Sequence, residues 1–430
     1  MLEPNLNPKK CILLLGASTD QLFIIKTAHE MGLETAVIDG NPNAPGLEIA
    51  NYSAPIDFSN IPAVIAFVND LKNKGVNMSG VTTMGSDVPH FVSKIANQYG
   101  WSGPSEETGR LATNKYEMKC RFKDCDIPVP NFCLVNSAEK ILELWQKWNC
   151  LKIIVKPTDR AGARGVRVVF NKSEINDAFD HAKANSRNGQ VLIEEYIEGP
   201  QFSTETIISA DQAKTPGFVD RVYENMEGFL PNIIENGGRF PSNYPDKISE
   251  LKNLAEKAAR AIGINNGVGK GDLVYCPKRG PLVIEVAARL GGGDFCESLV
   301  PLGTGVNYVK QVINIAIGEK VNFDELEPII NMHVANRNFF PPPGKLTGIK
   351  GIDEVDKLNE VKKFQISYKH GDEIPLIQNH AQKAGVFVVV SNTAEEIKKL
   401  VEYIYHVVQF EINGKYYSGN PIYYNQYKNL

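Results

Sequence analysis

Asp272 and Glu285 are two carboxylates that the local pattern of the chain would bring face to face. The runs 270–276 and 282–288 alternate polar and apolar residues, and the Pro-Lys-Arg-Gly-Pro sequence between them is typical of a turn, so we expect a β-hairpin. Directly opposed residues have Cβ atoms about 4.5–5.5 Å apart, and like charges repel there. A divalent cation between the two carboxylates would remove that repulsion, since carboxylate oxygens are ligands of Mg²⁺.

The opposition of the two acids depends on where the hairpin turns. A turn centred on the 278–279 peptide pairs the two acids, whereas a bulge in either strand would shift the register. Alternation then places Arg289 on the same face as Glu285, and a glycine run, Gly291–Gly293, follows. Two acids and an arginine directed at one spot suit Mg²⁺ and a phosphoryl group, although hairpin charges can also form a solvated face.

Two lysines and a loop of small residues are candidates for binding phosphate groups. Asn114 is expected to cap a helix with Lys115 in its first turn, where a cation opposes the helix dipole unless an anion lies nearby. Lys156 ends an apolar strand that Pro157 stops. The segment 158–166 interleaves arginines with small residues, so its N–H groups can fold over phosphates; a plain surface hairpin loop is the alternative.

The segment Val191–Ile208 has the pattern of an adenine site. A hydrophobic strand runs into Glu194-Glu195-Tyr196-Ile197, a Gly-Pro turn follows, and an alternating strand begins. Backbone groups in such a hinge can bind the purine edge, while the tyrosine and the isoleucine supply apolar contact.

Composition excludes several classes of protein. With 430 residues, 43% hydrophobic and 22% charged, the chain is long enough for two or three globular domains. A net charge of −4 gives no general attraction to nucleic acid or acidic membranes, and no apolar run reaches membrane-spanning length. The seven cysteines form no CxxC pair, which favours reduced thiols and a cytoplasmic location.

Residues 9–100 alternate strands and helices, which predicts a parallel sheet with helices on its faces. Such sheets bind ligands at the carboxyl ends of their strands. A dinucleotide site is one interpretation, but the turn at Gly16-Ala17-Ser18 lacks the second and third glycines of G-x-G-x-x-G. Asp87, after another of these strands, is therefore expected to be a capping residue or a substrate contact.

In their order and spacing these motifs together resemble the ATP-grasp superfamily, and most closely its carboxylate–amine ligase branch, which includes L-amino-acid ligases. The resemblance covers nearly the whole chain and implies an α/β (α+β overall) ATP-grasp fold. Its parts would be an N-terminal Rossmann-like pre-ATP-grasp domain (1–110), a two-lobed ATP-binding domain (111–320) with a small lid lobe at about 120–195, and a C-terminal α/β segment (321–430) that completes the large lobe.

The resemblance implies a role for each motif. The catalytic groups would be Arg289, at the transferred phosphoryl and the acyl phosphate, and Lys156, at the ATP phosphates and near the adenine. Asp272 and Glu285 would bind Mg²⁺, with Mn²⁺ possible. The ATP-binding residues would be Lys115, Lys156, Gly162, Ala163, Arg164, Gly165, Glu194, Glu195, Tyr196, Ile197 and Gln201. The candidates for substrate contact are Asp87, Gly291, Gly292, Gly293 and Arg337.

Three positions depart from the family pattern. Asp272 stands where many relatives have glutamate, and Gln201 stands where they commonly have a glutamate for the ribose hydroxyls. Ala287 replaces the asparagine ligand of the pattern E-x-N-x-R. A water or a phosphate oxygen can fill that position on Mg²⁺. These changes bear on metal number and nucleotide affinity more than on the class of reaction.

The reaction implied is the ATP-dependent joining of a carboxylate to an amine through an acyl phosphate, with release of ADP and phosphate (EC 6.3-like). Its partners would be small-molecule substrates, with no nucleic acid or membrane and a possible homodimer. Three alternatives stay open: an ATP-grasp carboxylase of the biotin carboxylase or purine type, a non-catalytic ATP-binding module, and a dinucleotide oxidoreductase, which the missing glycines disfavour.

Overall fold

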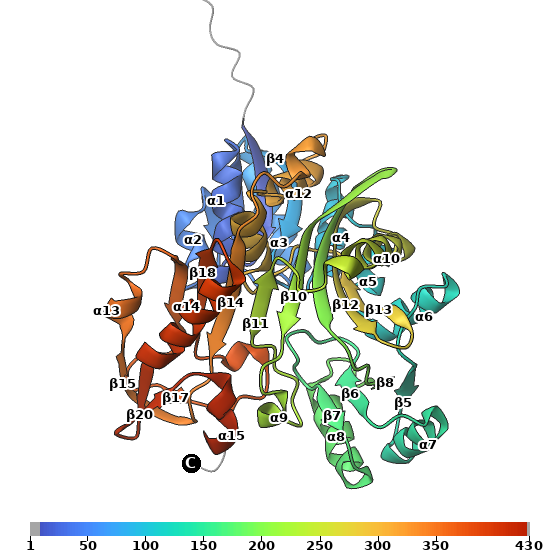
Figure 1. The fold of residues 1–430 in the computed structure, drawn as a ribbon. Helices are drawn as coiled ribbons and strands as arrows, with labels where there is room; N and C mark the ends of the chain where they lie inside the picture. Colours follow the sequence, from blue (N-terminus) through green and yellow to red (C-terminus); the bar gives the residue numbers. More distant parts are fainter. Residues whose placement is uncertain (1–8, 428–430) are drawn as a thin grey trace, which may run out of the picture.

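The computed structural model describes residues 9–427, and these form four β-sheets. In Figure 1 the largest sheet runs through the middle of the molecule, the N-terminal sheet lies above it, and a small lobe and the C-terminal segment lie below it on opposite sides. Mixed helix and sheet was the predicted class. The termini of the two outer predicted domains, residues 1–8 and 428–430, fall outside the described residues.

The N-terminal sheet is parallel, as predicted, with strand order β3-β2-β1-β4. Its elements are β1 (Lys10–Leu15), α1 (Leu22–Glu30), β2 (Glu34–Ile38), α2 (Gly46–Ile49), β3 (Tyr52–Ala54), α3 (Ile61–Asn73), β4 (Asn77–Thr83) and α4 (Pro89–Tyr99). A helix from much later in the chain, α12 (Val309–Ala316), packs between this sheet and the largest one. Its Val312 and Ile313 share a core with Ile12 and Leu14 of β1, and the same core includes Ile207 of the largest sheet.

The small lobe is an antiparallel sheet of order β5-β8-β6-β7. Its elements are β5 (Phe132–Val135), α7 (Ala138–Trp148), β6 (Ile153–Pro157), β7 (Arg167–Val169), α8 (Ile175–Asn185) and β8 (Val191–Glu195), preceded by α5 (Glu106–Leu111) and α6 (Lys115–Asp124). The predicted cap of α6 is confirmed, since the Asn114 side chain accepts hydrogen bonds from the backbone of Tyr116 and Glu117. Lys115 is therefore the first residue of that helix.

The central sheet has the order β13-β12-β9-β10-β11-β14-β18-β16. Its strands are β9 (Gln201–Ser209), β10 (Gln212–Val222), β11 (Gly237–Phe240), β12 (Asn266–Cys276), β13 (Gly280–Ala287), β14 (His333–Phe339), β16 (Val361–Ile366) and β18 (Gly385–Ser391). On one face, Leu251 and Ala258 of α10 (Ile248–Ala261) pack against Phe202 and Leu273. The last three strands come from the C-terminal segment, so this segment extends the same sheet that carries the hairpin.

The C-terminal segment also has a sheet of its own, of order β17-β15-β19-β20. The remaining elements are α9 (Met226–Phe229), α11 (Val300–Thr304), β15 (Gly344–Lys350), α13 (Ile352–Val355), β17 (Glu373–Ile374), α14 (Ala394–Val407), β19 (Gln409–Ile412), β20 (Lys415–Ser418) and α15 (Tyr424–Tyr427). Tyr424 stacks on Phe229 with ring centroids 4.4 Å apart, which makes it a packing residue. Within residues 9–427, every helix is too short or too polar to span a bilayer.

Candidate active site

β12 and β13 form the predicted antiparallel hairpin, and Asp272 lies directly opposite Glu285. The predicted turn is displaced, however. Cys276 pairs with Gly280, so the turn centres on Lys278 rather than on the peptide bond that follows it.

A β-bulge at Ile284 compensates for the displaced turn. Leu273 pairs with Val283, and the next pair along the hairpin is Asp272 with Glu285, so Ile284 has no partner on β12. Without this extra residue Asp272 would face Ile284, and the side chain of Glu285 would point to the other face of the sheet.

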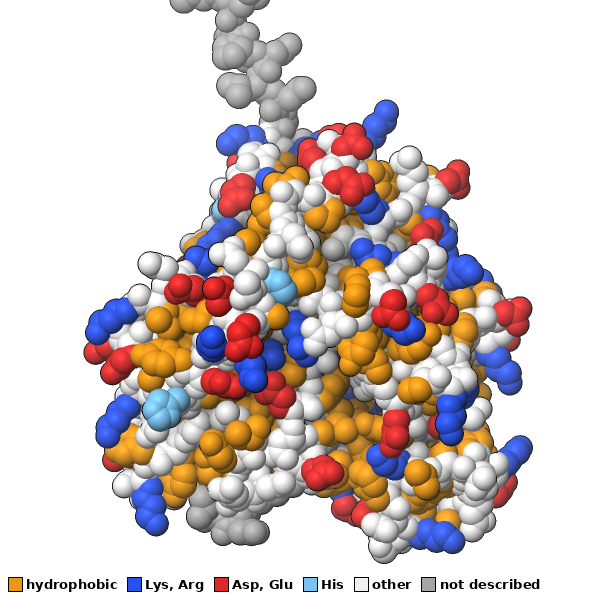
Figure 2. All heavy atoms as spheres, viewed as in Figure 1, with side chains coloured by type: hydrophobic (Ala, Val, Ile, Leu, Met, Phe, Trp, Pro, Cys, Tyr) orange, Lys and Arg blue, Asp and Glu red, His pale blue; other side chains and the backbone are white. Residues whose placement is uncertain are grey.

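Most of the predicted site residues line one cavity of about 580 Å³, a size typical of small-molecule sites. The cavity lies between the small lobe, the central sheet and the C-terminal segment, and Figure 2 shows the surface hollowed between the two lower parts of the molecule. The predicted residues that line it are Lys115, Lys156, Gly162, Ala163, Arg164, Glu194, Glu195, Tyr196, Ile197, Gln201, Asp272, Glu285, Arg289, Gly292 and Gly293.

Two of the other predicted residues have structural contacts instead. Gly165 shapes the small-residue loop: its φ is +73°, and a Cβ there would lie 2.6 Å from Cβ of Asn185. The structure does not bring Arg337 to the cavity. Its Nε lies 3.2 Å from a carboxylate oxygen of Glu224, and its Nη1 donates to the carbonyl of Gly238 at 3.0 Å, so both of these groups make contacts within the protein.

Asp87 reaches the site through Arg289. Both Nε and Nη2 of Arg289 donate to one carboxylate oxygen of Asp87, at 3.0 and 2.7 Å. Burial raises the pKa of Asp87, but the charges of Arg289 and Lys115 and the hydrogen bond from Arg289 together lower it below its ordinary value. The leading domain therefore holds the predicted catalytic arginine in place.

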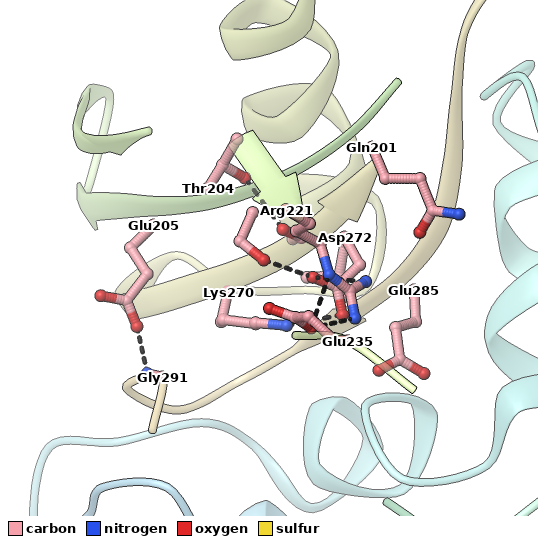
Figure 3. A network of polar contacts seen from close by, with 12 residues as sticks. Gln201, Thr204, Glu205, Arg221, Glu235, Lys270, Asp272, Glu285 and Gly291 are labelled. Carbon is pink, nitrogen blue, oxygen red and sulfur yellow. Dashed lines mark hydrogen bonds and ion pairs between the residues drawn. The ribbon is translucent and has the colours of Figure 1, made fainter. Parts of the chain in front are cut away.

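Gly291 is held by a buried acid on β9. Its backbone nitrogen and the hydroxyl of Tyr308 both donate to the carboxyl group of Glu205. Burial raises the pKa of Glu205 to about 7, although both donors act in the opposite direction. Figure 3 shows this acid apart from the cluster of charges around Asp272.

Lys115 and Glu285 form an ion pair with Nζ and Oε2 3.2 Å apart. The same Nζ donates to the carbonyl of Arg160 at 2.8 Å, and the backbone nitrogen of Lys115 donates to Thr158. Burial would raise the pKa of Glu285, but the ammonium groups of Lys115, Lys270 and Lys156 hold it well below its ordinary range. Glu285 is therefore an ionised carboxylate on the cavity wall.

Asp272 is at the centre of a network that joins three strands (Figure 3). Its oxygens accept from Ser203 at 2.8 Å and lie 2.5 Å from Nζ of Lys270 and 3.4 Å from Arg221. Arg221 in turn donates to Glu235 from Nε and Nη2, at 3.0 and 2.6 Å. Lys270, Arg221 and Glu235 all line the cavity but were not predicted, because no local motif marks them.

The two carboxylates suit a divalent metal bound with the help of phosphate oxygens. Both side chains line the cavity from neighbouring strands, and carboxylate oxygens are preferred by Mg²⁺, which keeps several waters or phosphate ligands. Among residues 9–427, no group of three or more acidic, histidine or cysteine side chains could hold a metal without such ligands. The donor set fits a metal that arrives with a nucleotide.

The C-terminal segment also lines the cavity and contributes two more lysines. Lys363 of β16 lies 2.6 Å from carboxylate oxygens of both Asp294 and Glu297, and Lys383 also faces the cavity. Neither lysine was predicted, because Lys363 on β16 and the segment that carries Lys383 reach the cavity only through the fold of the C-terminal segment. An isolated charge in an amphipathic strand gives no signal of its own.

Two family models match parts of this chain. The family model described as an ATP-grasp domain matches residues 112–293, and the one described as L-amino acid ligase C-terminal domain 2 matches residues 337–413. An L-arginine-specific L-amino acid ligase of Bacillus subtilis is 24% identical over 65% of this chain and 67% of its own length.

Solved structures share the fold. An L-amino acid ligase from Bacillus licheniformis superposes with a TM-score of 0.80 at 19% identity, over 94% of this chain and 98% of that chain. The biotin carboxylase domain of Hydrogenobacter thermophilus 2-oxoglutarate carboxylase, a dimer in complex with MgADP, ADP and bicarbonate, gives a TM-score of 0.71 at 16% identity, over 93% of this chain and 90% of that chain.

Proposed function

The chain belongs to the carboxylate–amine ligase branch of the ATP-grasp superfamily and is an ATP-dependent ligase, and from this premise we propose that it joins a small carboxylate to a small amine through an acyl phosphate. The observation that carries the proposal is the opposition of Asp272 and Glu285 on the wall of a cavity that Lys115, Lys156 and Arg289 also line. Carboxylates that can bind a metal ion and cationic side chains that can bind phosphates thus line the same cavity, as phosphoryl transfer requires.

In the first step a carboxylate oxygen of the substrate attacks the γ-phosphorus of ATP, and the bond from that phosphorus to ADP breaks. Lys115 and Lys156 offset the negative charge of the phosphates, and Arg289, fixed by Asp87, offsets the charge on the transferred group. A magnesium ion held by Asp272 and Glu285 would supply further charge neutralisation at the phosphate oxygens.

In the second step the amine nitrogen attacks the acyl carbon, phosphate leaves, and the nitrogen loses a proton. No side-chain nucleophile is needed. The loop 158–166 and the C-terminal segment limit the access of water, which would otherwise hydrolyse the acyl phosphate.

Turnover of paired substrates tests the proposal. Incubation with ATP, Mg²⁺ and a panel of carboxylates and amines should release ADP and phosphate only with a productive pair, and hydroxylamine should trap the acyl phosphate as a hydroxamate. Appearance of AMP would exclude the acyl-phosphate route. Release that requires bicarbonate would favour a carboxylase instead, and no stimulated release at all would favour a non-catalytic ATP-binding module.

Two further parts of the proposal concern the whole protein. We place it in the cytoplasm because its seven cysteines are all free thiols in the structure. A homodimer is proposed by analogy with the dimeric Hydrogenobacter thermophilus domain. Light scattering coupled to size-exclusion chromatography should give a mass near 95 kDa for a dimer of this 47.5 kDa chain. A mass near that of one chain would contradict the dimer.

A further inference from the structure

Lys119 is a fully buried lysine that none of the steps above uses. It lies one helical turn after Lys115 on α6, so both side chains project from the same face of the helix. Burying an ammonium group destabilises the fold unless the group is paired and hydrogen-bonded. Its partners therefore indicate what this lysine stabilises.

The first partner of Lys119 is the backbone of the β-bulge. Its Nζ donates to the carbonyl oxygen of Ile284 at 2.9 Å. Ile284 is the residue that has no partner on β12, and β13 is an edge strand, so its carbonyl has no strand on the other side. The neighbouring bonds on that edge also involve residues near α6: Val283 donates to Pro128 and Val286 to the sulfur of Met118.

The second partner of Lys119 is Glu194. Nζ of Lys119 lies 3.3 Å from Oε1 of Glu194, and Nζ of Lys156 lies 2.7 Å from the same oxygen. All three side chains are at least nine-tenths buried. One carboxylate is thus shared between two ammonium groups, and the group of three carries a net charge of one positive unit beside the cavity.

From these contacts we propose that Lys119 is a positioning residue with two effects. It holds the bulge that places Glu285 opposite Asp272, and it neutralises Glu194, so that the positive charge of Lys156 remains available to the phosphates. The proposal rests on the metal–nucleotide site of the proposed function. Without Lys119, the pair Lys156–Glu194 would be neutral, and the register of Glu285 would lose the bond that fixes it.

Binding measurements test this without turnover. In Lys119→Met we expect ATP affinity without metal to fall roughly tenfold, because the group formed with Lys156 and Glu194 loses its net positive charge beside the cavity. We expect the Mg²⁺ concentration needed for half-maximal ATP binding to rise by about 10- to 100-fold, the range for groups that orient metal ligands. Calorimetric titration with a non-hydrolysable ATP analogue measures both.

Two further variants separate a positioning role from a folding role. Lys123→Met changes an exposed lysine on the same helix, and both affinities should stay at the wild-type value. Should Lys119→Met unfold, the double variant Lys119→Met with Glu194→Gln removes one positive and one negative charge from the buried group of three. It should show the same rise in the Mg²⁺ concentration needed for half-maximal ATP binding.

Unchanged Mg²⁺ dependence in the folded Lys119 variants, with only thermal stability reduced, would overturn the proposal. Failure of the ligase reaction would appear differently, because wild-type protein would then bind ATP and Mg²⁺ but turn over no pair of substrates. Wild-type protein that binds neither would overturn both proposals together.

Discussion

The carbonyl oxygen of Gly162 accepts a hydrogen bond of 3.1 Å from the backbone nitrogen of His380. This contact joins the small-residue loop of the small lobe to the C-terminal segment across the cavity. The ring of His380 continues the connection, since its Nε2 accepts from the backbone of Glu235 at 3.2 Å. Burial lowers the pKa of His380 to about 3, so the ring is neutral and free to accept. The loop is therefore tied to the network around Asp272.

Replacing His380 by proline should weaken the closure of the loop. His380 begins a short 3₁₀ turn, where proline is tolerated, and Asn379 before it is extended (φ −155°, ψ 171°), as a residue preceding proline must be. His380→Pro and His380→Ala both lose the ring, but only proline loses the N–H donated to Gly162. We expect the proline variant to show a three- to tenfold higher KM for ATP than the alanine variant, because that ratio corresponds to the net free energy of about one hydrogen bond. Equal KM values in the two variants would contradict this.

Glu285→Gln should stop turnover while the fold persists. The change removes an ionised carboxylate from the predicted metal site but keeps its shape, so we expect kcat to fall by roughly 100-fold or more. Higher Mg²⁺ should recover only part of the loss. Glu354→Gln, an exposed acid on α13, is the matched control and should match wild type. Wild-type rates in Glu285→Gln would remove this residue from the catalytic set.

The buried Glu205 should make stability depend on pH. Its pKa in the folded protein is raised to about 7, above the ordinary value of 4.5, so the native state binds more protons between these pH values. Its contribution is fully present below pH 4.5 and is lost as pH rises through 7, by roughly 3 kcal/mol. Glu205→Gln should reduce the pH dependence of the free energy of unfolding, measured by urea denaturation between pH 5 and 8. A pH profile unchanged from wild type would show that Glu205 does not titrate in this range.

Gly292→Ala should disturb the join between the leading domain and the glycine run. A Cβ at Gly292 would lie 2.9 Å from Cα of Gly85, so the two backbones must separate. Gly293→Ala is the informative comparison, because nothing lies within 4 Å of its Cβ and only its positive φ of 64° opposes the change, at about 1–2 kcal/mol. We expect kcat/KM to fall further in Gly292→Ala. The reverse order would show that loop conformation matters more than contact with Gly85.

Local pattern was sufficient for the parts of the site that lie on one strand or one helix end. Asn114 and Lys115 were found from capping chemistry, and the Asp272–Glu285 opposition from alternation. That opposition was reached through two compensating features, a turn displaced by half a residue and a bulge at Ile284. Nothing in the local sequence signals such a bulge, because its stabilising contact comes from Lys119 on a distant helix.

Residues that act across domains could not be predicted from one sequence. Arg221, Lys363 and His380 reach the cavity only through the strand order of the central sheet and the fold of the C-terminal segment. Lys119 did leave a weak signal, since it follows Lys115 by four residues and lies beside the buried Met118 on one helical face. A lysine on an apolar face is a cue for a buried partner.

The interleaving of α12 with the leading domain has a practical consequence for dissecting the protein. Ile313 is packed with Ile12 and Leu14, and the same core continues to Ile207 and Val334 on the central sheet. A recombinant fragment limited to residues 112–293 would present this apolar interior to solvent and is expected to aggregate. Fragments that divide the chain near residue 110 or 320 should regain solubility only when the missing piece is supplied by co-expression.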